Sequence, residues 1–429
     1  MTSRRAVLVG LVLGVVASTI WIVALQWGIY SWHGINDLPV YEAASRRMAD
    51  GQLPYRDFAL EYPPLAAGLF WLTGALPGTF ATAFSGLMLL SLLVTLAGVI
   101  ASAQALNANQ GRTVAAGLVV AAIPLLIGNL VETRFDLAFA AVLAWVVWAA
   151  LTQRFRLVWL LLGIAVALKI VLLVLIPLLV IWHLHQRGAK AAALGLLGSS
   201  AVVGAVFLPF AIVAPQGTWD IFDYHLQRPL QLESFGGSYL LALHALAGTR
   251  VAITSSFGSQ GFPAQGPSVI ASLSTALLAI SIAAIAFTVW RLLRSSRRED
   301  GARLVGAAIA ATIGATLVFG KVLSPQFMLW LLPVAFLVHH RFGVVAFASG
   351  LLAILLTLAY FPHHYWRLVA LDSGPITVLA LRNLSLAIFV AAAWPRAISR
   401  IAAPMLHGPR TGERSDTPDT AVAARYLTD

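Results

Sequence analysis

Residues 33–64 read HGINDLPVYEAASRRMADGQLPYRDFALEYPP and end an uncharged run that begins at Ala6. The stretch holds five of the 17 Asp and Glu residues of the chain within 25 positions. Charged side chains are expensive in lipid, so this stretch is expected to lie outside the membrane while its flanks lie inside. The alternation of a long apolar run, a patterned polar loop and further apolar runs predicts an all-α polytopic membrane protein.

A short amphipathic helix is expected at the start of this loop. Asp37 is suited to cap the helix, and Gly51 is suited to lie just past its end. Such a helix would rest on the membrane surface with its apolar side inward. The apolar positions that recur at helical spacing are Val40, Ala44 and Met48.

The composition supports the membrane assignment. The chain is 59% hydrophobic and 10% charged, whereas soluble domains carry roughly 25% charged residues. The absence of cysteine excludes disulfides and thiolate catalysis. The net charge of +11 comes largely from arginines in short loops between apolar segments, which the positive-inside rule explains better than nucleic-acid binding.

Residues 6–29 are expected to form an uncleaved first span, because the apolar run is too long for a signal peptide. Residues 65–77 are a shorter apolar piece suited to a re-entrant segment. Each span requires roughly 20 apolar residues. The later spans are expected at 80–103, 113–130, 135–152, 190–212, 267–290, 303–319, 325–338, 342–360 and 376–395.

Residues 157–184 are too long for one ordinary span, and Lys169 lies near their middle. If this segment crossed once, every later basic loop would lie outside. If it is a hairpin that turns at Lys169, the inner loops hold 18 Lys and Arg against 6 Asp and Glu, and the outer loops hold 9 against 11. The hairpin is therefore favoured, which gives about 12 crossings with both termini cytoplasmic.

The chain is expected to form one transmembrane domain over residues 1–403 in the plasma membrane. Its main outer loops are 30–64, 213–266 and 361–375. Residues 404–429 are polar and are expected to form a disordered cytoplasmic tail.

The hairpin topology gathers carboxylates, basic groups and aromatics at one membrane face. Ionisable groups at membrane depth are usually functional, so this face suits a substrate with an anionic head and a lipid tail. The groups placed there lie in the 33–64 loop, at Glu132, Arg134 and Asp136, at Lys169, in 220–234, in 321–326 and in 362–367.

Each candidate also has a structural interpretation. Asp37 could serve only as a cap, with Glu61 as the rival catalytic base. Glu132, Arg134 and Asp136 could neutralise one another, and Lys169 could end a half-helix. His225 and Arg228 could be ordinary loop residues, and His363 and His364 could be interfacial. Adjacent histidines lack the i,i+4 spacing of a helical zinc site, so no metal is expected.

The motifs of this face resemble those of glycosyltransferase family 87. They are Asp37-x-x-Val-Tyr41, Gly51-x-x-Pro54-Tyr55, Tyr62-Pro63-Pro64, Tyr224-His225-x-x-Arg228-Pro229 and Ser324-Pro325-Gln326. The resemblance spans most of residues 20–340 and is most specific in the first loop. It implies the GT-C fold, and the family includes mannosyltransferases of actinobacterial envelope glycolipids that use polyprenyl-phosphate mannose.

The resemblance also implies a reaction. An acidic residue at the start of the first outer loop is the catalytic base of GT-C enzymes, and Asp37 matches that position. The implied donor is a polyprenyl-phosphate sugar, the acceptor is a lipid or glycan, and the anomeric centre inverts on the outer face. No cofactor and no nucleic-acid partner are implied. The residues expected to bind substrate are Tyr41, Tyr55, Glu61, Tyr62, Arg134, Lys169, His225, Arg228, Lys321, Gln326, His363 and His364.

The chemistry is consistent with so small a set of acids. Ordinary glycoside hydrolysis uses a pair of carboxylates, but a phosphate ester leaves without a general acid. One base for the acceptor hydroxyl and cations for the departing phosphate are enough. Mannose is the expected sugar and arabinofuranose the alternative. A lipid or glycan transporter is the competing class, with Arg382 as the intramembrane charge that favours it.

Overall fold

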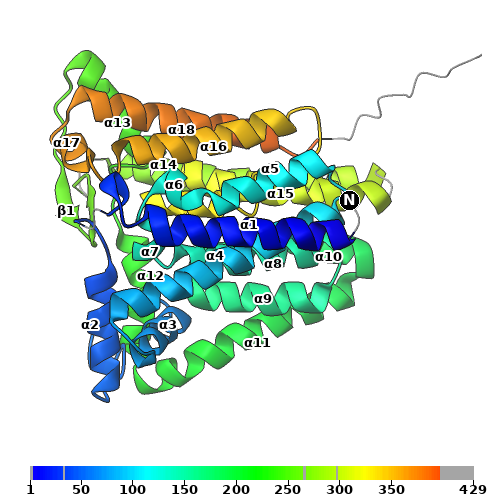
Figure 1. Ribbon diagram of the computed structural model, residues 1–429, viewed down its shortest axis with the longest axis horizontal. Helices are drawn as coiled ribbons and strands as arrows, with labels where there is room; N and C mark the ends of the chain where they lie inside the picture. Colours follow the sequence, from blue (N-terminus) through cyan, green and yellow to red (C-terminus); the bar gives the residue numbers. More distant parts are fainter. Residues whose placement is uncertain (1–2, 32–33, 264–266, 296–297, 397–429) are drawn as a thin grey trace, which may run out of the picture. The chain divides into compact units, whose positions relative to one another are not determined.

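The computed structural model describes residues 3–31, 34–263, 267–295 and 298–396, so the expected tail at 404–429 lies outside the described residues. The described chain is helical apart from one short hairpin of strands (Figure 1). The first half holds α1 (Ser3–Ala24), η1 (Gly28–Ser31), α2 (Leu38–Ala49), α3 (Pro64–Ala75), α4 (Phe80–Ala105), α5 (Gln110–Ala121), α6 (Ile123–Ile127), α7 (Leu130–Thr133), α8 (Asp136–Leu151), α9 (Phe155–Leu168), η2 (Ile170–Leu175), α10 (Ile176–Arg187) and α11 (Ala189–Val213). The second half holds α12 (Pro215–Gln227), α13 (Phe235–Ala247), β1 (Thr254–Ser256), β2 (Ser259–Gly261), α14 (Ser268–Ser295), α15 (Arg298–Phe319), η3 (Pro325–Leu331), α16 (Gly343–Tyr360), α17 (Tyr365–Val369) and α18 (Ser373–Ala393).

Long apolar helices confirm a multi-pass membrane protein. Eight helices in the described residues are long and apolar enough to cross a bilayer. The remaining expected spans coincide with shorter or broken helices: α5 and α6, α8, α9, and η3. Twelve crossings therefore stay a prediction. The eight helices are Arg4–Ala24, Phe80–Ala105, Ile170–Arg187, Ala189–Val213, Ser268–Ser295, Asp300–Phe319, Gly343–Tyr360 and Ser373–Ala393.

The chain folds back on itself at Lys169, as the charge pattern predicted. The ring of His183 near the end of α10 stacks on Phe155 at the start of α9, with centroids 4.0 Å apart. Trp159 Nε1 donates a hydrogen bond of 2.9 Å to His183 Nδ1. In one continuous helix these residues would be more than 30 Å apart at ~1.5 Å per residue. The extended backbone of Lys169 makes the turn between α9 and η2.

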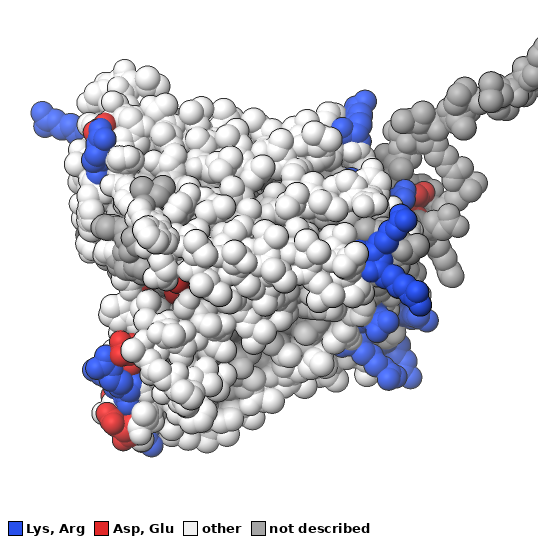
Figure 2. All heavy atoms as spheres, viewed as in Figure 1, with Lys and Arg blue, Asp and Glu red and all other residues white. Residues whose placement is uncertain are grey.

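The two ends of the helix bundle differ in charge. Figure 2 shows Lys and Arg gathered at one end, a wide uncharged band beside it, and mixed charges at the opposite end. We call these the basic end and the polar end. The uncharged band has the character of a lipid-facing surface. The helix ends and turns that meet at the basic end carry Arg4, Arg5, Arg112, Arg154, Arg156, Arg187, Lys190, Arg291, Arg294, Arg303, Arg341 and Arg396.

The helix of the first loop forms where it was expected, but one detail of the prediction is wrong. Gly51 has φ +81° just past the end of α2, as a helix-terminating glycine requires. Asp37 precedes α2 without capping it; Asn36 Oδ1 accepts the hydrogen bond of the Leu38 amide instead, at 3.1 Å. The Tyr41 face of α2 packs against α3 and Val40 is 46% exposed, so the contact of the Val40 side with the membrane surface stays a prediction.

Proline and burial explain the broken helices. A proline lacks an amide hydrogen and disfavours the interior of a helix, so it commonly lies at a helix start or break. Pro124 opens α6 after the short α5, Pro177 lies in the first turn of α10, and Pro325 opens the 3₁₀ segment η3. These breaks bring polar backbone and side chains to the polar end, between long helices that bury them.

We predict that the polar end is extracytoplasmic, because the positive-inside rule places the basic end in the cytoplasm. In this cysteine-free chain, Gln52→Cys in the exposed loop after α2 should react with an impermeant maleimide in intact cells. Lys190→Cys, exposed at the start of α11, should react only after permeabilisation. The unmodified chain is the blank, and labelling of position 190 alone in intact cells would invert the topology.

Candidate active site

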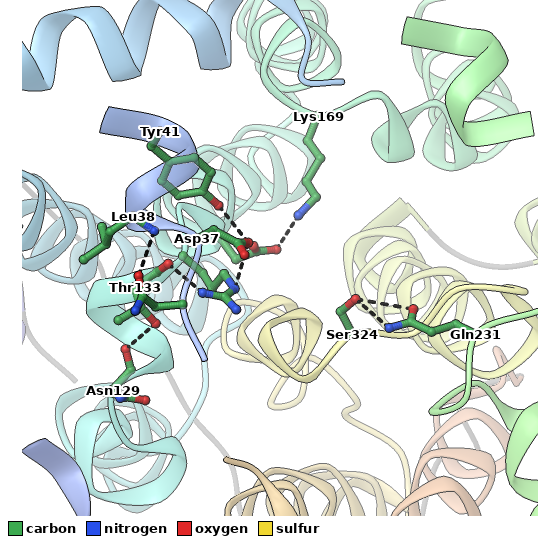
Figure 3. Close-up of polar contacts among 11 residues, drawn as sticks. Asp37, Leu38, Tyr41, Asn129, Thr133, Lys169, Gln231 and Ser324 are labelled. Atoms are coloured by element: carbon green, nitrogen blue, oxygen red, sulfur yellow. Dashed lines mark hydrogen bonds and ion pairs between the residues drawn. The ribbon is translucent and has the colours of Figure 1, made fainter. Parts of the chain in front are cut away.

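Asp37 lies at the polar end with its carboxylate held from two sides (Figure 3). Arg134 Nε is 2.9 Å from Asp37 Oδ2, and the Tyr41 hydroxyl donates to the same oxygen at 3.2 Å. The Asp37 side chain is 31% exposed, and the Arg134 side chain only 6%. Asp37 Oδ1 has no hydrogen-bond partner among the described residues. The carboxylate is therefore oriented through one oxygen while the other remains available to a ligand.

A cluster of aromatic rings supports this carboxylate. Tyr41 stacks on Phe70 with centroids 4.2 Å apart, and its ring meets the edges of Tyr62 and Phe135. Such offset and edge contacts add to the stability of a packed apolar core. Burial raises the pKa of the Tyr41 hydroxyl well above its ordinary value, with Tyr62 and Asp37 adding to the effect. Tyr41 consequently remains a hydrogen-bond donor toward Asp37 at neutral pH.

Glu132, Arg134 and Asp136 do not neutralise one another, so the interpretation as a structural triplet is wrong. Arg134 pairs with Asp37, whereas Asp136 pairs with Lys169 across a distance of 2.5 Å. Glu132 Oε2 accepts from Ser85 on α4 at 3.1 Å. Each charge of this segment reaches a different part of the chain.

Lys169 lies in a nearly enclosed aromatic environment. Its Nζ is 4.7 Å from the centroid of the Phe327 ring and 5.0 Å from those of Phe135 and Trp330. Trp330 Nε1 also donates to Asp136 Oδ1, at 2.7 Å. Ion pairing and cation–π contact compensate the desolvation of the ammonium group. Figure 3 shows the Lys169 side chain reaching toward the region of Asp37.

A second group of polar residues comes from α12 and the loop before η3. Arg228 Nη2 donates to Ser259 Oγ at 3.0 Å, and its guanidinium lies 5.7 Å from the Tyr224 ring. Lys321 Nζ donates to the Leu226 carbonyl at 2.6 Å. Two cations from separate segments thus gather around the end of α12.

His225 belongs to this group but is not a cation at neutral pH. Burial, together with the nearby charges of Arg228, Lys169 and Lys321, lowers the pKa of His225 to about 4. A neutral imidazole can still donate one hydrogen bond to a phosphate oxygen.

Glu61 connects the Asp37 group with the Arg228 group. Burial raises the pKa of Glu61, and the nearby Asp37 raises it further, while Arg228 lowers it. Glu61 is therefore close enough to both to interact electrostatically. Asp37, Glu61 and Arg228 therefore belong to one connected polar region.

Tight backbone packing holds the first loop in place. The Tyr55 hydroxyl donates to the Tyr62 carbonyl at 2.7 Å, and the Tyr55 ring meets the edge of Phe210. A Cβ added to Gly217 in α12 would lie 1.9 Å from the Tyr55 carbonyl oxygen. Glycine at 217 therefore allows α12 to lie directly on the first loop. Tyr55 and Tyr62 use their polar groups to shape the loop around the site.

A buried polar network, which sequence reasoning missed, anchors the cationic side. Tyr360 and Gln231 donate to the two carboxylate oxygens of Glu233 at 2.7 and 3.1 Å. Arg382 Nη2 donates to the Glu233 carbonyl at 2.8 Å, and Asn383 Nδ2 lies 3.3 Å from the same oxygen. Burial raises the pKa of Glu233 to about 7. Two adjacent polar residues in the apolar run of α18, Arg382 and Asn383, were the available signal.

This network extends to the Lys321 loop. The side-chain Oε1 of Gln231 accepts a hydrogen bond from the Leu323 backbone amide at 3.0 Å. The backbone amide of Gln231 donates to the Lys321 carbonyl at 2.9 Å. Ser324 of the Ser324-Pro325-Gln326 motif bonds Gln231 rather than facing a ligand. The segments that carry Arg228 and Lys321 are thereby fixed to each other and to α18.

The remaining predicted site residues lie at the margin. Gln326 is half-buried in η3. His363 and His364 are exposed just before α17, and His364 lies near the exposed pair of Arg367 and Asp372. Within the described ranges no three His, Asp or Glu side chains are grouped as metal ligands.

Comparison with protein families adds the chemical class. Residues 60–325 match glycosyltransferase family 87. The chain belongs to glycosyltransferase family 87. No curated protein matches it. The match contains Glu61, Arg134, Lys169 and Arg228 and begins after Asp37. It makes this protein a membrane glycosyltransferase, and its polar end the candidate active site.

We expect the pairing of Lys169 with Asp136 to be needed for stability. Lys169→Met leaves a carboxylate buried without its countercharge, which typically destabilises a protein by about 3–5 kcal/mol. The midpoint of thermal unfolding in detergent should fall clearly. Adding Asp136→Asn removes the stranded charge and keeps an acceptor for Trp330, so the double variant should recover much of the loss. Equal midpoints in the single and double variants would contradict the pairing.

Proposed function

We propose that this glycosyltransferase moves a sugar from a polyprenyl-phosphate donor to a lipid or glycan acceptor on the extracytoplasmic face. The observation that carries the proposal is Asp37, an oriented carboxylate at the end of membrane helices, at the same polar end as the cations Arg228 and Lys321. A lipid-linked donor presents its phosphate at that level of the membrane. The motifs of the first loop favour mannose as the sugar and hexosyl transfer as the reaction.

The proposed mechanism is a single displacement. Asp37 accepts the proton of the acceptor hydroxyl as its oxygen attacks the anomeric carbon. The bond from that carbon to the phosphate oxygen breaks, and polyprenyl phosphate leaves with the bonding electrons. Arg228 and Lys321 stabilise the charge on the leaving phosphate, and neutral His225 donates a hydrogen bond. Attack opposite the leaving group inverts the configuration at the anomeric carbon.

Asp37 is preferred over Glu61 as the base because of its orientation. Arg134 and Tyr41 fix one carboxylate oxygen of Asp37 and leave Oδ1 for the acceptor. Fixed positioning of a catalytic group is a large part of its effect. Glu61, between Asp37 and Arg228, is placed to bind hydroxyls of the transferred sugar. Its raised pKa keeps it the rival base.

The transporter interpretation loses its main support. It depended on Arg382 as an unexplained charge within a span. Arg382 is fully buried and donates to the Glu233 carbonyl, so it stabilises the loop that precedes α13. This contact gives Arg382 a structural role that requires no transport pathway, although its Nε and Nη1 have no hydrogen-bond partner among the described residues.

Asp37→Asn tests the base directly. Asparagine keeps the shape and can accept the hydrogen bond of the Tyr41 hydroxyl, but it cannot take up the proton. Turnover should fall on the order of 10²–10⁴-fold, while donor binding and the unfolding midpoint stay near the original values. The assay is release of polyprenyl phosphate from a polyprenyl-phosphate mannose donor by purified protein.

Glu61→Gln is the matched control, since it neutralises the neighbouring carboxylate. A smaller loss is expected from it. Full activity of Asp37→Asn combined with an inactive Glu61→Gln would transfer the role of base to Glu61. Full activity of both would contradict the proposed mechanism.

Arg228→Ala tests the phosphate contact. We predict a rise of at least tenfold in the KM for the donor and little change in the KM for the acceptor, because the guanidinium meets the donor phosphate. Arg228→Lys should rescue only part of the loss, since lysine lacks the two-pronged geometry of arginine. Arg250→Ala, an exposed arginine beyond α13, serves as control. Unchanged donor dependence in Arg228→Ala would remove this residue from the site.

A further inference from the structure

The basic end of the protein contains an open pocket between the start of α9 and the end of α10. Its volume is about 500 Å³, within the range of small-molecule sites. Arg154, Arg156 and Arg187 line it together with Phe155, Leu157 and His183. The pocket exists because the chain folds back at Lys169, which brings the two ends of the 155–187 segment together. It lies at the opposite end of the helices from Asp37.

The charge of this pocket is not balanced by the protein. No carboxylate pairs with Arg154, Arg156 or Arg187 anywhere in the described part of the chain. The ion pairs found among the described residues all lie at the polar end. Arg154 packs on the Trp148 ring at 4.7 Å, and Arg156 and Arg187 are exposed. Three guanidinium groups around one hollow make a site for an anion with several oxygens.

The walls of the pocket suit a lipid rather than a soluble anion. Phe155 and half-buried Leu157 line it, and exposed Leu160 and Leu184 continue from it along α9 and α10 into the uncharged band. The His183 ring that lines the pocket accepts a hydrogen bond from Trp159 and stacks on Phe155, so this wall of the pocket is rigid. A headgroup in the hollow would leave its acyl chains along these leucines.

We propose that this pocket binds the headgroup of an anionic phospholipid of the cytoplasmic leaflet. The arginines bind the phosphate, and the apolar walls of α9 and α10 accept the first part of the acyl chains. Basic pockets between transmembrane helices on the cytoplasmic side have this preference in general. The bound lipid would hold the start of α9 against the end of α10 and so support the hairpin that carries Lys169.

The test uses purified full-length protein and dioleoyl phosphatidylglycerol, with dioleoyl phosphatidylcholine and inorganic phosphate as comparison ligands. Native mass spectrometry gives the affinity of each. We expect phosphatidylglycerol to bind at least tenfold more tightly than phosphatidylcholine. The triple variant Arg154→Gln, Arg156→Gln, Arg187→Gln should lower the affinity for phosphatidylglycerol at least tenfold. It should also bind phosphatidylglycerol and phosphatidylcholine equally.

The matched control is Arg291→Gln, Arg294→Gln, Arg341→Gln. It removes three arginines from the same end, each of which also packs on an aromatic ring, and should leave the affinity unchanged. An equal loss in both triple variants would reduce the effect to the general charge of the basic end and overturn the proposal. Inorganic phosphate that binds as tightly as phosphatidylglycerol would assign the pocket to a soluble anion instead.

A second measurement does not depend on the stability of the triple variant. Leu157→Cys in the cysteine-free chain can be labelled with bimane. Brominated phosphatidylglycerol should quench this label more strongly than brominated phosphatidylcholine at the same fraction in the membrane. Equal quenching by the two lipids would also overturn the proposal.

Discussion

The ion pair of Asp136 and Lys169 joins the parts of the polar end. It connects the first residue of α8 to the turn between α9 and η2, and Trp330 of η3 bonds the same carboxylate oxygen. The start of α8, the turn after α9 and the segment η3 are thereby held together at the Asp136 carboxylate. Low-dielectric surroundings make such a pair strong when both partners are present and unfavourable when one is missing. Arg134, two residues before Asp136, then reaches Asp37 from a fixed position.

The two sides of the site are held by different means. The carboxylate side depends on direct contacts of Asp37 and on packed rings around Tyr41. The cationic side depends on a buried network in which Glu233 and Arg382 fix the backbone that carries Arg228 and Lys321. Hydrogen bonds buried away from water fix the segments that they join, here through Arg382 Nη2 and Asn383 Nδ2, while Arg382 Nε and Nη1 have no hydrogen-bond partner among the described residues. This division allows a charged donor to meet cations that do not themselves neutralise Asp37.

Much of the fold could be predicted from the sequence, because the hydropathy of each segment and the charge of each loop depend only on the local sequence. The turn at Lys169 followed from the net positive charge of the loops after it, which belong on the cytoplasmic side. The partners of single charges could not be predicted, because Arg134 fits Asp136 beside it as well as Asp37 far along the chain. The cap was wrong for a related reason: Asn36 and Asp37 are both suited to the role, and only the pull of Arg134 and Tyr41 decides between them. Glu233 was overlooked because its partners lie on α16 and α18.

The shortness of α8 and α9 has a consequence for the route of the substrate. These helices have 16 and 14 residues, or about 24 and 21 Å at ~1.5 Å per residue, whereas the hydrocarbon layer is ~30 Å thick. On the predicted topology, with Arg154 and Arg156 at the cytoplasmic boundary, Asp136 and Lys169 would lie several ångströms below the extracytoplasmic one. The polar groups of the site would then lie within the hydrocarbon layer, so a lipid substrate would not have to leave the membrane to reach them. A membrane-bound carrier can then enter sideways with its hydrocarbon tail still dissolved in the bilayer, and only its head changes surroundings.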